Sequence, residues 1–214
     1  EIRVLKEIMT NLFDHRSTDP VDMSPYRDFF LHHSKLDIDR VAGAGNMVSL
    51  LIQSELGLDD FELAEDVKKY TLAKVESLFH IRHENGTVQF FDKPLDPSIF
   101  AKVVLVKEND ELVPLDGVES LEKVKAVRME AKKKVFVTNA IRSLSKVSPT
   151  GNPRDIQFVV MVGGSALDFE IPNFVTDALA DYEIVAGRGN IRGCEGPRNA
   201  VATGLAMACV EQEN

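Results

Sequence analysis

Tryptophan is absent from this 214-residue chain, aromatic residues make up only 7% of it, and cysteine occurs twice, at Cys194 and Cys209. Two cysteines cannot build a disulfide framework, so we expect a reduced, cytoplasmic protein with an aliphatic core. Apolar runs such as 158–162 are far shorter than the roughly 20 residues that cross a bilayer, which argues against a membrane protein. No secretory signal opens the chain, and its start at Glu1 indicates a processed or excised piece.

Basic residues are too few for a typical nucleic-acid binder. The chain has 25 lysines and arginines against 34 aspartates and glutamates, a net charge of −9. A surface that binds DNA or RNA normally shows a basic excess, so we expect no nucleic-acid partner. With 44% hydrophobic and 28% charged residues, the composition is that of one ordinary globular domain or two small ones.

Metal and nucleophile chemistry have little support in the sequence. The pairs His32-His33 and His80/His83 lack a carboxylate or cysteine at convincing ligand spacing, so no metal site is predicted. No Ser-His-Asp arrangement and no nucleophile elbow stands out. We therefore predict no catalytic residue from motifs alone.

Hydrophobic periodicity predicts a mixed helix and strand content. After residue 41, apolar residues at helical spacing cover residues 47–56, 63–79 and 121–144. The pair Asn85-Gly86 lies between the segments 80–82 and 88–91, which is typical of a β-hairpin. The segment 100–106 fits either a strand or the end of a helix.

The C-terminal third alternates strand and helix. The run 158–162 is continuously apolar, as expected of a parallel strand buried on both faces. A helix over 169–180, a short strand over 183–186 and a helix from Pro197 to about residue 210 follow it. This order predicts an α/β layer.

Gly163-Gly164-Ser165 lies where the apolar strand gives way to a helix. Ligands of open α/β sheets gather at the carboxyl ends of strands, and glycines let a planar ligand approach the backbone. A tight turn that needs a positive φ explains the glycines equally well. The residues alone leave both interpretations open.

Two other glycine clusters are weaker candidates. Gly43-Ala44-Gly45 lacks the third glycine of a dinucleotide fingerprint, because position 48 is valine, so a structural turn is favoured over a Rossmann oxidoreductase. The loop 187–198 has four glycines and three arginines before a predicted helix, whose N-terminus favours anions. A solvated surface loop explains it equally well.

Glu65, Lys68 and Lys69 lie in one predicted helix, with Glu65 and Lys69 four residues apart. Such a pair usually marks an ion-paired surface that contributes a few tenths of a kcal/mol. Composition and spacing therefore reach no further than an α/β protein that could bind a nucleotide.

Five long segments between Val41 and about Ala208, roughly four-fifths of the chain, resemble the large subunit of diol and glycerol dehydratase reactivating factors. They are AGAGNMVSLLIQSELGL, KKYTLAKVESLFHIRHENGTVQFF, KKKVFVTNAIRSL, VGGSALDFEIPNFVTDAL and VAGRGNIRGCEGPRNAVATGLAMA. Residues 1–40 do not resemble that family.

The resemblance implies half of an actin, sugar-kinase and heat-shock-chaperone ATPase fold, which is ribonuclease H-like, with a small β-containing insertion. Residues 41–210 would be its C-terminal part, with a helical and β subdomain at about 55–120 and a sheet subdomain at about 121–210. It also implies a chaperone that uses ATP or ADP with Mg²⁺ to release damaged cobalamin from adenosylcobalamin-dependent diol or glycerol dehydratase. The implied partners are the small subunit and the dehydratase, in the cytoplasm; association with a bacterial microcompartment stays open.

The same resemblance implies a set of adenosine-binding residues. Glu65 would point towards the ribose hydroxyls and Lys68 would lie beside the base, while Arg198 would either stack on the base or close the pocket. Gly43 to Asn46 would lie nearer the phosphates. The implied nucleoside-binding residues are Glu65, Asp66, Val67, Lys68, Gly164, Ser165 and Arg198.

The chain departs from the family at the phosphates. A hairpin of the form Asp-Leu-Gly-Ala-Gly-Ser-Thr is expected before the Ala-Gly-Ala-Gly stretch, but residues 32–40 read HHSKLDIDR. Hydrolysis depends on positioned phosphates and Mg²⁺, so we expect this chain alone to hydrolyse ATP poorly or not at all. The alternative is a non-catalytic module that docks on the small subunit or the dehydratase through residues 84–118.

Overall fold

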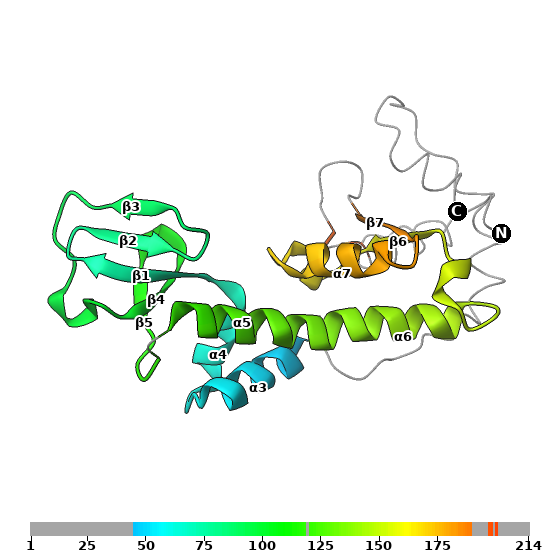
Figure 1. Ribbon diagram of the computed structural model, residues 1–214, viewed down its shortest axis with the longest axis horizontal. Coiled ribbons are helices and arrows are strands. Elements are labelled where there is room, and N and C mark those ends of the chain that lie inside the picture. Colours follow the sequence, from blue (N-terminus) through cyan, green and yellow to red (C-terminus); the bar gives the residue numbers. More distant parts are fainter. Residues whose placement is uncertain (1–44, 119, 190–196, 199, 201–214) are drawn as a thin grey trace, which may run out of the picture. The chain divides into compact units, whose positions relative to one another are not determined.

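A computed structural model of the chain describes residues 45–118, 120–189, 197, 198 and 200. The chain divides into two compact units: the first is residues 42–142, and the described part of the second begins at residue 143. The described residues form helices and strands, which confirms the predicted mixture (Figure 1). No helix within them is long and apolar enough to cross a membrane. The subdomain boundary expected near residue 120 stays a prediction.

The first unit contains a five-stranded antiparallel sheet with the strand order β3-β2-β1-β4-β5. Gly86 has a φ of +88° in the turn between β2 and β3, which confirms the hairpin predicted from Asn85-Gly86. The undecided segment 100–106 ends in a strand. The strands are β1 (Thr71–Ser77), β2 (His80–His83), β3 (Val88–Phe90), β4 (Val103–Val106) and β5 (Leu112–Pro114).

The helix predicted over 63–79 is wrong beyond Lys69. Helix α4 (Phe61–Lys69) ends there, and Tyr70 adopts an extended conformation with φ −107° and ψ 156°. The next seven residues form the central strand, β1, which pairs with β2 on one side and β4 on the other. Backbone pairing on both sides outweighs the helical spacing of the apolar residues, and β-branched Thr71 and Val75 suit a strand.

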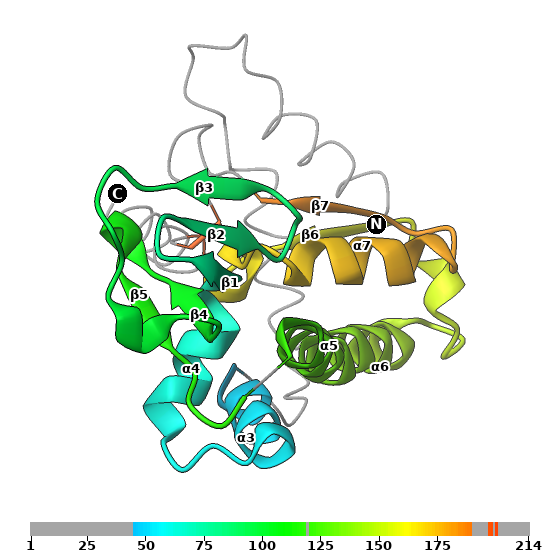
Figure 2. The same ribbon diagram turned by 60° about the vertical axis from the view of Figure 1, so that its left-hand side comes forward.

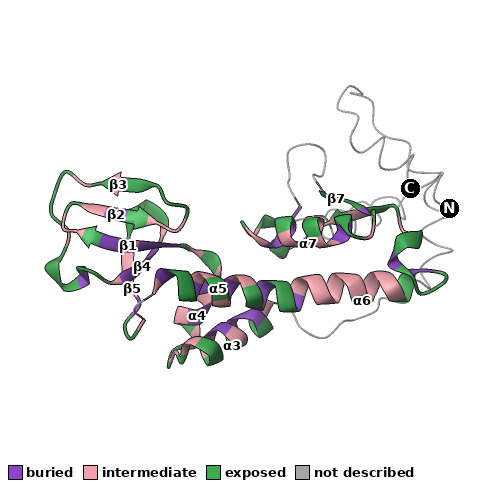
Figure 3. Ribbon diagram, in the orientation of Figure 1, coloured by how far each residue is buried: buried purple, intermediate pink, exposed green. Residues whose placement is uncertain are grey.

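Three helices cover one face of this sheet. Helix α3 (Gly45–Leu56) confirms the prediction over 47–56, and it packs with α4 and α5 (Leu121–Lys132) (Figure 2). The apolar cluster between helices and sheet includes Val48, Ile52, Ala64, Val67, Leu72, Val103, Leu105 and Val124. A smaller cluster on the other face contains Ala73, Val75, Ile81, Ile99 and Val104. The central strands β1 and β4 therefore contain most of the buried residues of the sheet, whereas β3 and β5 have none (Figure 3).

A buried ion pair ties α5 to the β2–β3 hairpin. Arg128 is completely buried, and its Nη2 donates to Glu84 Oε2 at 2.6 Å while its Nη1 donates to the backbone oxygen of Tyr70 at 3.2 Å. The side chain of Glu84 is only 9% exposed. A buried guanidinium needs such partners, because burial of an unpaired charge is strongly unfavourable.

The helix predicted over 121–144 is confirmed and runs slightly further. It consists of α5, a π-helical turn (Lys133–Val137) and α6 (Thr138–Val147). Its capping serine, Ser120, accepts a hydrogen bond from the backbone N–H of Lys123 at 3.2 Å. The boundary between the two units lies inside α6.

The described part of the second unit contains the parallel strands β6 (Phe158–Met161) and β7 (Val185–Arg188), with α7 (Ile171–Ala180) packed against β7. The predicted parallel strand and the helix with Pro172 in its first turn are confirmed. The last strand starts two residues later than predicted, because Glu183 has a φ of +62°. Burial of β6 on both faces is wrong: Phe158 is 48% exposed, and its register partner Val185 is 59% exposed.

Candidate functional site

Glu65 and Lys68, one turn apart on α4, form the centre of a polar network. Lys68 Nζ donates to the backbone oxygen of Gly45 at 3.1 Å, to Ser49 Oγ at 2.9 Å and to Glu65 Oε1 at 2.5 Å. Ser49 Oγ donates to the same oxygen of Glu65. Lys69 Nζ lies 3.1 Å from the other oxygen, Glu65 Oε2. The network joins the first turns of α3 to α4.

Most of this network is shielded from solvent. Ser49 is completely buried, and the side chains of Lys68 and Glu65 are 13% and 18% exposed, whereas that of Lys69 is 55% exposed. Burial by itself would raise the pKa of Glu65, but hydrogen bonds from Lys68, Ser49 and Lys69 outweigh it and lower the pKa from 4.5 to about 2. Glu65 is therefore an ionised carboxylate at neutral pH.

The hydrogen-bonding capacity of Lys68 is fully used. An ammonium group has three N–H donors, and each of them has an acceptor here. Glu65 Oε1 accepts from Ser49 and Lys68, while Oε2 contacts only Lys69 within the part of the chain that the structure describes. Glu65 Oε2 is therefore the atom of this network that can accept a hydrogen bond from a ligand.

The other two predicted residues of α4 lie in different surroundings. Val67 is completely buried in the apolar cluster of the first unit, so its side chain serves packing. Asp66 Oδ2 pairs with Lys107 Nζ at 2.6 Å, and both side chains are about a quarter exposed, 24% and 25%. Of these three residues of α4, only Glu65 takes part in the polar network with Ser49 and Lys68.

The two glycines after β6 differ in conformation and surroundings: Gly163 forms a turn with positive φ, and the backbone of Gly164 is open to solvent. Gly163 has φ +91° and ψ −179°, a conformation almost restricted to glycine, which supports the turn interpretation at this position. Gly164 begins a 3₁₀ turn (Gly164–Leu167), and a Cβ added to it would meet no described atom within 4 Å. Gly164 and Ser165 are exposed, so the backbone here is accessible to a ligand.

Arg198 lies in the same unit as this turn. The N–H of Gly163 donates to the backbone oxygen of Pro197 at 2.8 Å, which brings the residue before Arg198 to the glycine pair. Arg198 itself is exposed. Glu65 to Lys68 belong to the first unit, and Gly164, Ser165 and Arg198 belong to the second.

Several predicted features lie outside the described residues. They are the strand and segment before residue 42, the Gly43-Ala44 part of the glycine turn, the loop residues 190–196 and most of the helix from Pro197. Gly45 is described and begins α3, and Gly189 is described and buried beside β6.

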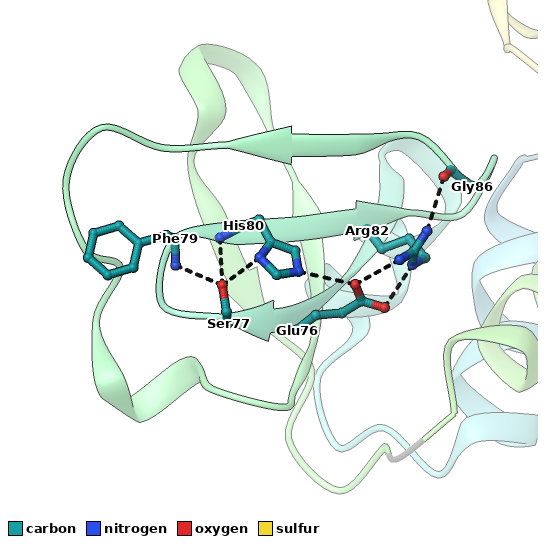
Figure 4. Close-up of polar contacts among 6 residues, drawn as sticks. All are labelled: Glu76, Ser77, Phe79, His80, Arg82 and Gly86. Atoms are coloured by element: carbon teal, nitrogen blue, oxygen red, sulfur yellow. Dashed lines mark hydrogen bonds and ion pairs between the residues drawn. The ribbon is translucent and has the colours of Figure 1, made fainter.

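A second polar cluster, which the sequence did not indicate, lies at the turn between β1 and β2 (Figure 4). Ser77 Oγ lies 2.6 Å from His80 Nδ1, His80 Nε2 lies 3.3 Å from Glu76 Oε2, and Arg82 donates to both oxygens of Glu76 at 2.7 and 3.1 Å. The residue types are those of a Ser-His-acid arrangement. However, Ser77 Oγ already accepts the backbone N–H groups of Phe79 and His80, each at 3.1 Å. Because both lone pairs are occupied, the serine closes the turn rather than acting as a nucleophile.

A metal centre is not found among the residues that the structure describes: they contain no group of three or more His, Cys, Asp or Glu side chains that could hold an ion. Magnesium ions in proteins are held mainly by carboxylates, phosphates and water. No Mg²⁺ ligand is therefore assigned to these residues.

Comparison with known proteins identifies a family that covers most of the chain. Residues 28–209 match the family described as diol dehydratase reactivase ATPase-like domain. That match starts inside the first 40 residues, for which the sequence alone had indicated no resemblance. It supports the similarity expected from the five quoted segments.

Three relatives are each 62% identical over 192 residues, which is 90% of this chain and 30% of the relative. They are the diol dehydratase-reactivating factor large subunit of Klebsiella michiganensis and the propanediol dehydratase-reactivating factor large subunits of Citrobacter freundii and Salmonella typhimurium. The chain thus spans less than a third of the length of these relatives.

Two solved structures are also similar. One is described as glycerol dehydratase reactivase, with a TM-score of 0.75, 66% identity and coverage of 81% of this chain and 28% of that one. The other is a diol dehydratase-reactivating factor in nucleotide-free form, with a TM-score of 0.74, 68% identity and coverage of 78% and 27%. The chain therefore belongs to the diol dehydratase reactivase ATPase-like domain family, and its similarity is to the large subunits of these reactivating factors.

Proposed function

We propose that this chain is the part of a reactivating-factor large subunit that binds the adenosine moiety of ATP or ADP. The observation that carries the proposal is the turn after β6, where Gly163 takes a glycine-specific conformation and Gly164 leaves its backbone open. Membership of an ATPase-like domain family supports it, as does the similar structure whose title names a nucleotide-free form.

The proposed fold is half of an actin-like, ribonuclease H-like ATPase. The parallel pair β6–β7 with α7 packed on it is consistent with an α/β layer of that kind. The antiparallel sheet β1–β5 would be the smaller β-containing insertion.

The proposed roles follow the chemistry of each side chain. Glu65 accepts a hydrogen bond from a ribose hydroxyl through Oε2, and Arg198 stacks its planar guanidinium on the base. Gly164 and Ser165 lie against the nucleoside. Asp66, Val67 and Lys68 contribute through the structure of α4, because their side chains are paired or buried.

In the complete large subunit, we propose that ATP drives release of damaged cobalamin from an adenosylcobalamin-dependent diol or glycerol dehydratase. The relatives are named as large subunits, so we propose that a small subunit is a partner of the complete protein. This chain covers 30% of such a subunit, and hydrolysis needs phosphates and Mg²⁺ held in position. We therefore expect little or no ATP hydrolysis by this chain alone.

Calorimetric titration of the chain with ADP and Mg²⁺ tests adenosine binding. The wild-type chain should bind ADP, and Gly164→Val should abolish binding by placing a branched side chain where the backbone is now open. Ala180→Val is a matched control, since it adds bulk at an exposed position of α7 in the same unit. A folded wild-type chain that binds no ADP, or a Gly164→Val variant that binds it normally, contradicts the proposal.

A second candidate function is a docking module without nucleotide chemistry, acting through residues 84–118. The observation that favours it is a pair of aromatic side chains in that region, Phe90 and Phe100, which are 75% and 54% exposed. Thermal unfolding separates the two candidates: ADP should raise Tm only if the chain binds nucleotide. If ADP has no effect and Phe90→Asp weakens binding of the small subunit, the docking function is favoured.

A further inference from the structure

We propose that Ser49 is a positioning residue which, together with Lys68, fixes the Glu65 carboxylate so that its second oxygen accepts a ribose hydroxyl. This inference rests on the proposed binding of adenosine. It adds a residue of α3 to that function, and it assigns Lys68 to holding Glu65 instead of contacting the base.

Ser49 is an unusual choice for its position in the helix. It is completely buried, although alanine would favour the helix more and would avoid the cost of burying a hydroxyl. Its hydroxyl accepts from Lys68 Nζ at 2.9 Å and donates to Glu65 Oε1. The hydroxyl therefore bridges the two charged groups of α4 from the neighbouring helix.

This bridge fixes one oxygen of the carboxylate and leaves the other available. Glu65 Oε1 receives two hydrogen bonds, from Ser49 and Lys68. Lys68 cannot turn to a ligand without giving up one of its three acceptors, among them the backbone oxygen of Gly45. Glu65 Oε2 contacts Lys69 Nζ at 3.1 Å, and the side chain of Lys69 is 55% exposed, whereas Oε1 contacts the completely buried Ser49.

A carboxylate held in one orientation loses little side-chain entropy when it binds a hydroxyl. A site built to accept a hydrogen bond from a hydroxyl also discriminates against an analogue that lacks the hydroxyl. The inference therefore predicts selectivity for the complete ribose, and it predicts that this selectivity depends on Ser49.

The test is calorimetric titration with ADP, 2′-deoxy-ADP and 3′-deoxy-ADP in the presence of Mg²⁺. The wild-type chain should bind ADP about tenfold or more tightly than at least one deoxy analogue, the range for a hydrogen bond to a charged group. In Ser49→Ala, the preference for ADP over that deoxy analogue should fall to about threefold or less. Ser54→Ala, an exposed serine of the same helix, should leave the wild-type ratio unchanged.

Lys68→Met is the second variant, because it removes the same restraint from α4 without altering α3. Like Ser49→Ala, it should lower the ratio of the affinity for ADP to that for the deoxy analogue. It replaces Ser49→Ala if circular dichroism shows that Ser49→Ala is unfolded. An unchanged ratio in a folded Ser49→Ala or Lys68→Met variant that still binds ADP overturns this inference alone. Absence of ADP binding by the folded wild-type chain overturns the proposed function and this inference with it.

Discussion

The two units of the chain differ in how their sheets are stabilised. In the first unit, five antiparallel strands pair locally, and apolar clusters lie on both faces of the sheet. In the described part of the second unit, two parallel strands pair with each other, and helix α7 connects them along the chain. Phe158 and Val185 lie on the same exposed face of this pair. Parallel sheets are usually buried on both faces, whereas antiparallel sheets tolerate one open face. The first unit thus contains a core within the described residues, and it should dominate the response of the chain to core mutations.

The largest effect should come from the buried ion pair of the first unit. Arg128→Ala removes the guanidinium partner of Glu84, whose side chain is only 9% exposed, so we expect a loss of about 3–5 kcal/mol in the free energy of unfolding. Urea denaturation measures this loss. Arg82→Ala, which breaks the exposed pair with Glu76, is the matched control and should change the unfolding midpoint very little. Similar losses in both variants would mean that burial does not distinguish the two pairs.

An apolar truncation compares the two units directly. Leu72→Ala removes a completely buried side chain of the central strand and should cost about 2–5 kcal/mol through the lost contacts and the cavity. Phe158→Ala removes a larger side chain from an exposed strand face and should cost much less. Thermal or urea unfolding of both variants checks the order. A greater loss of unfolding free energy in Phe158→Ala than in Leu72→Ala would show that the second unit contributes more to stability than the first.

Acid should weaken the network between α3 and α4. The folded pKa of Glu65 is about 2 against 4.5 for the free group, so its stabilisation is present above pH 4.5 and is lost as the pH falls through 2. Between pH 5 and pH 3, the stability advantage of wild type over Glu65→Gln should shrink by about 2 kcal/mol. Urea unfolding of both proteins at the two pH values measures it. An advantage that stays constant would show that Glu65 titrates normally.

The smallest effect should come from a close backbone contact in the second unit. The N–H of Gly189 donates to Met161 O at 2.9 Å, and a Cβ at Gly189 would lie 2.8 Å from Val162 Cγ1. Gly189→Ala should therefore cost about 1 kcal/mol, the low end for added bulk, because the side chains of Val160 and Val162 must shift. Gly187→Ala is the control, since a Cβ there would meet no described atom within 4 Å. Equal thermal stability of the two variants would mean that the second unit adapts to the added methyl group.

Local signals allowed much of this fold to be predicted. Apolar spacing identified α3, the long helix of α5 and α6, and α7, while Asn85-Gly86 identified the β2–β3 hairpin. The same spacing failed for residues 71–79, because Leu72, Val75 and Leu78 also fit a helix. Pairing with β2 on one side and with β4 on the other makes this segment a strand, and apolar spacing does not encode that pairing.

The candidate site was less accessible from the sequence. Glu65 and Lys68 could be singled out as neighbours on one helix, but Ser49 lies 16 residues before Glu65 and joins it only through the packing of α3 on α4. The pairing of Glu84 with Arg128 spans 44 residues. Val67 was named with the site by its position in α4, and only the folded core shows that its side chain is buried. Contacts of this kind depend on tertiary structure, which periodicity does not encode.

The occupied donors of Lys68 have a consequence for covalent chemistry. Acylation of a lysine needs a nitrogen lone pair that reaches solvent, but Lys68 Nζ directs its three hydrogens to acceptors and its side chain is 13% exposed. The next residue, Lys69, is 55% exposed. Helix α4 therefore carries two adjacent lysines of opposite reactivity: acetyl groups should accumulate on Lys69 in the folded protein, and on Lys68 only when the contact between α3 and α4 has opened.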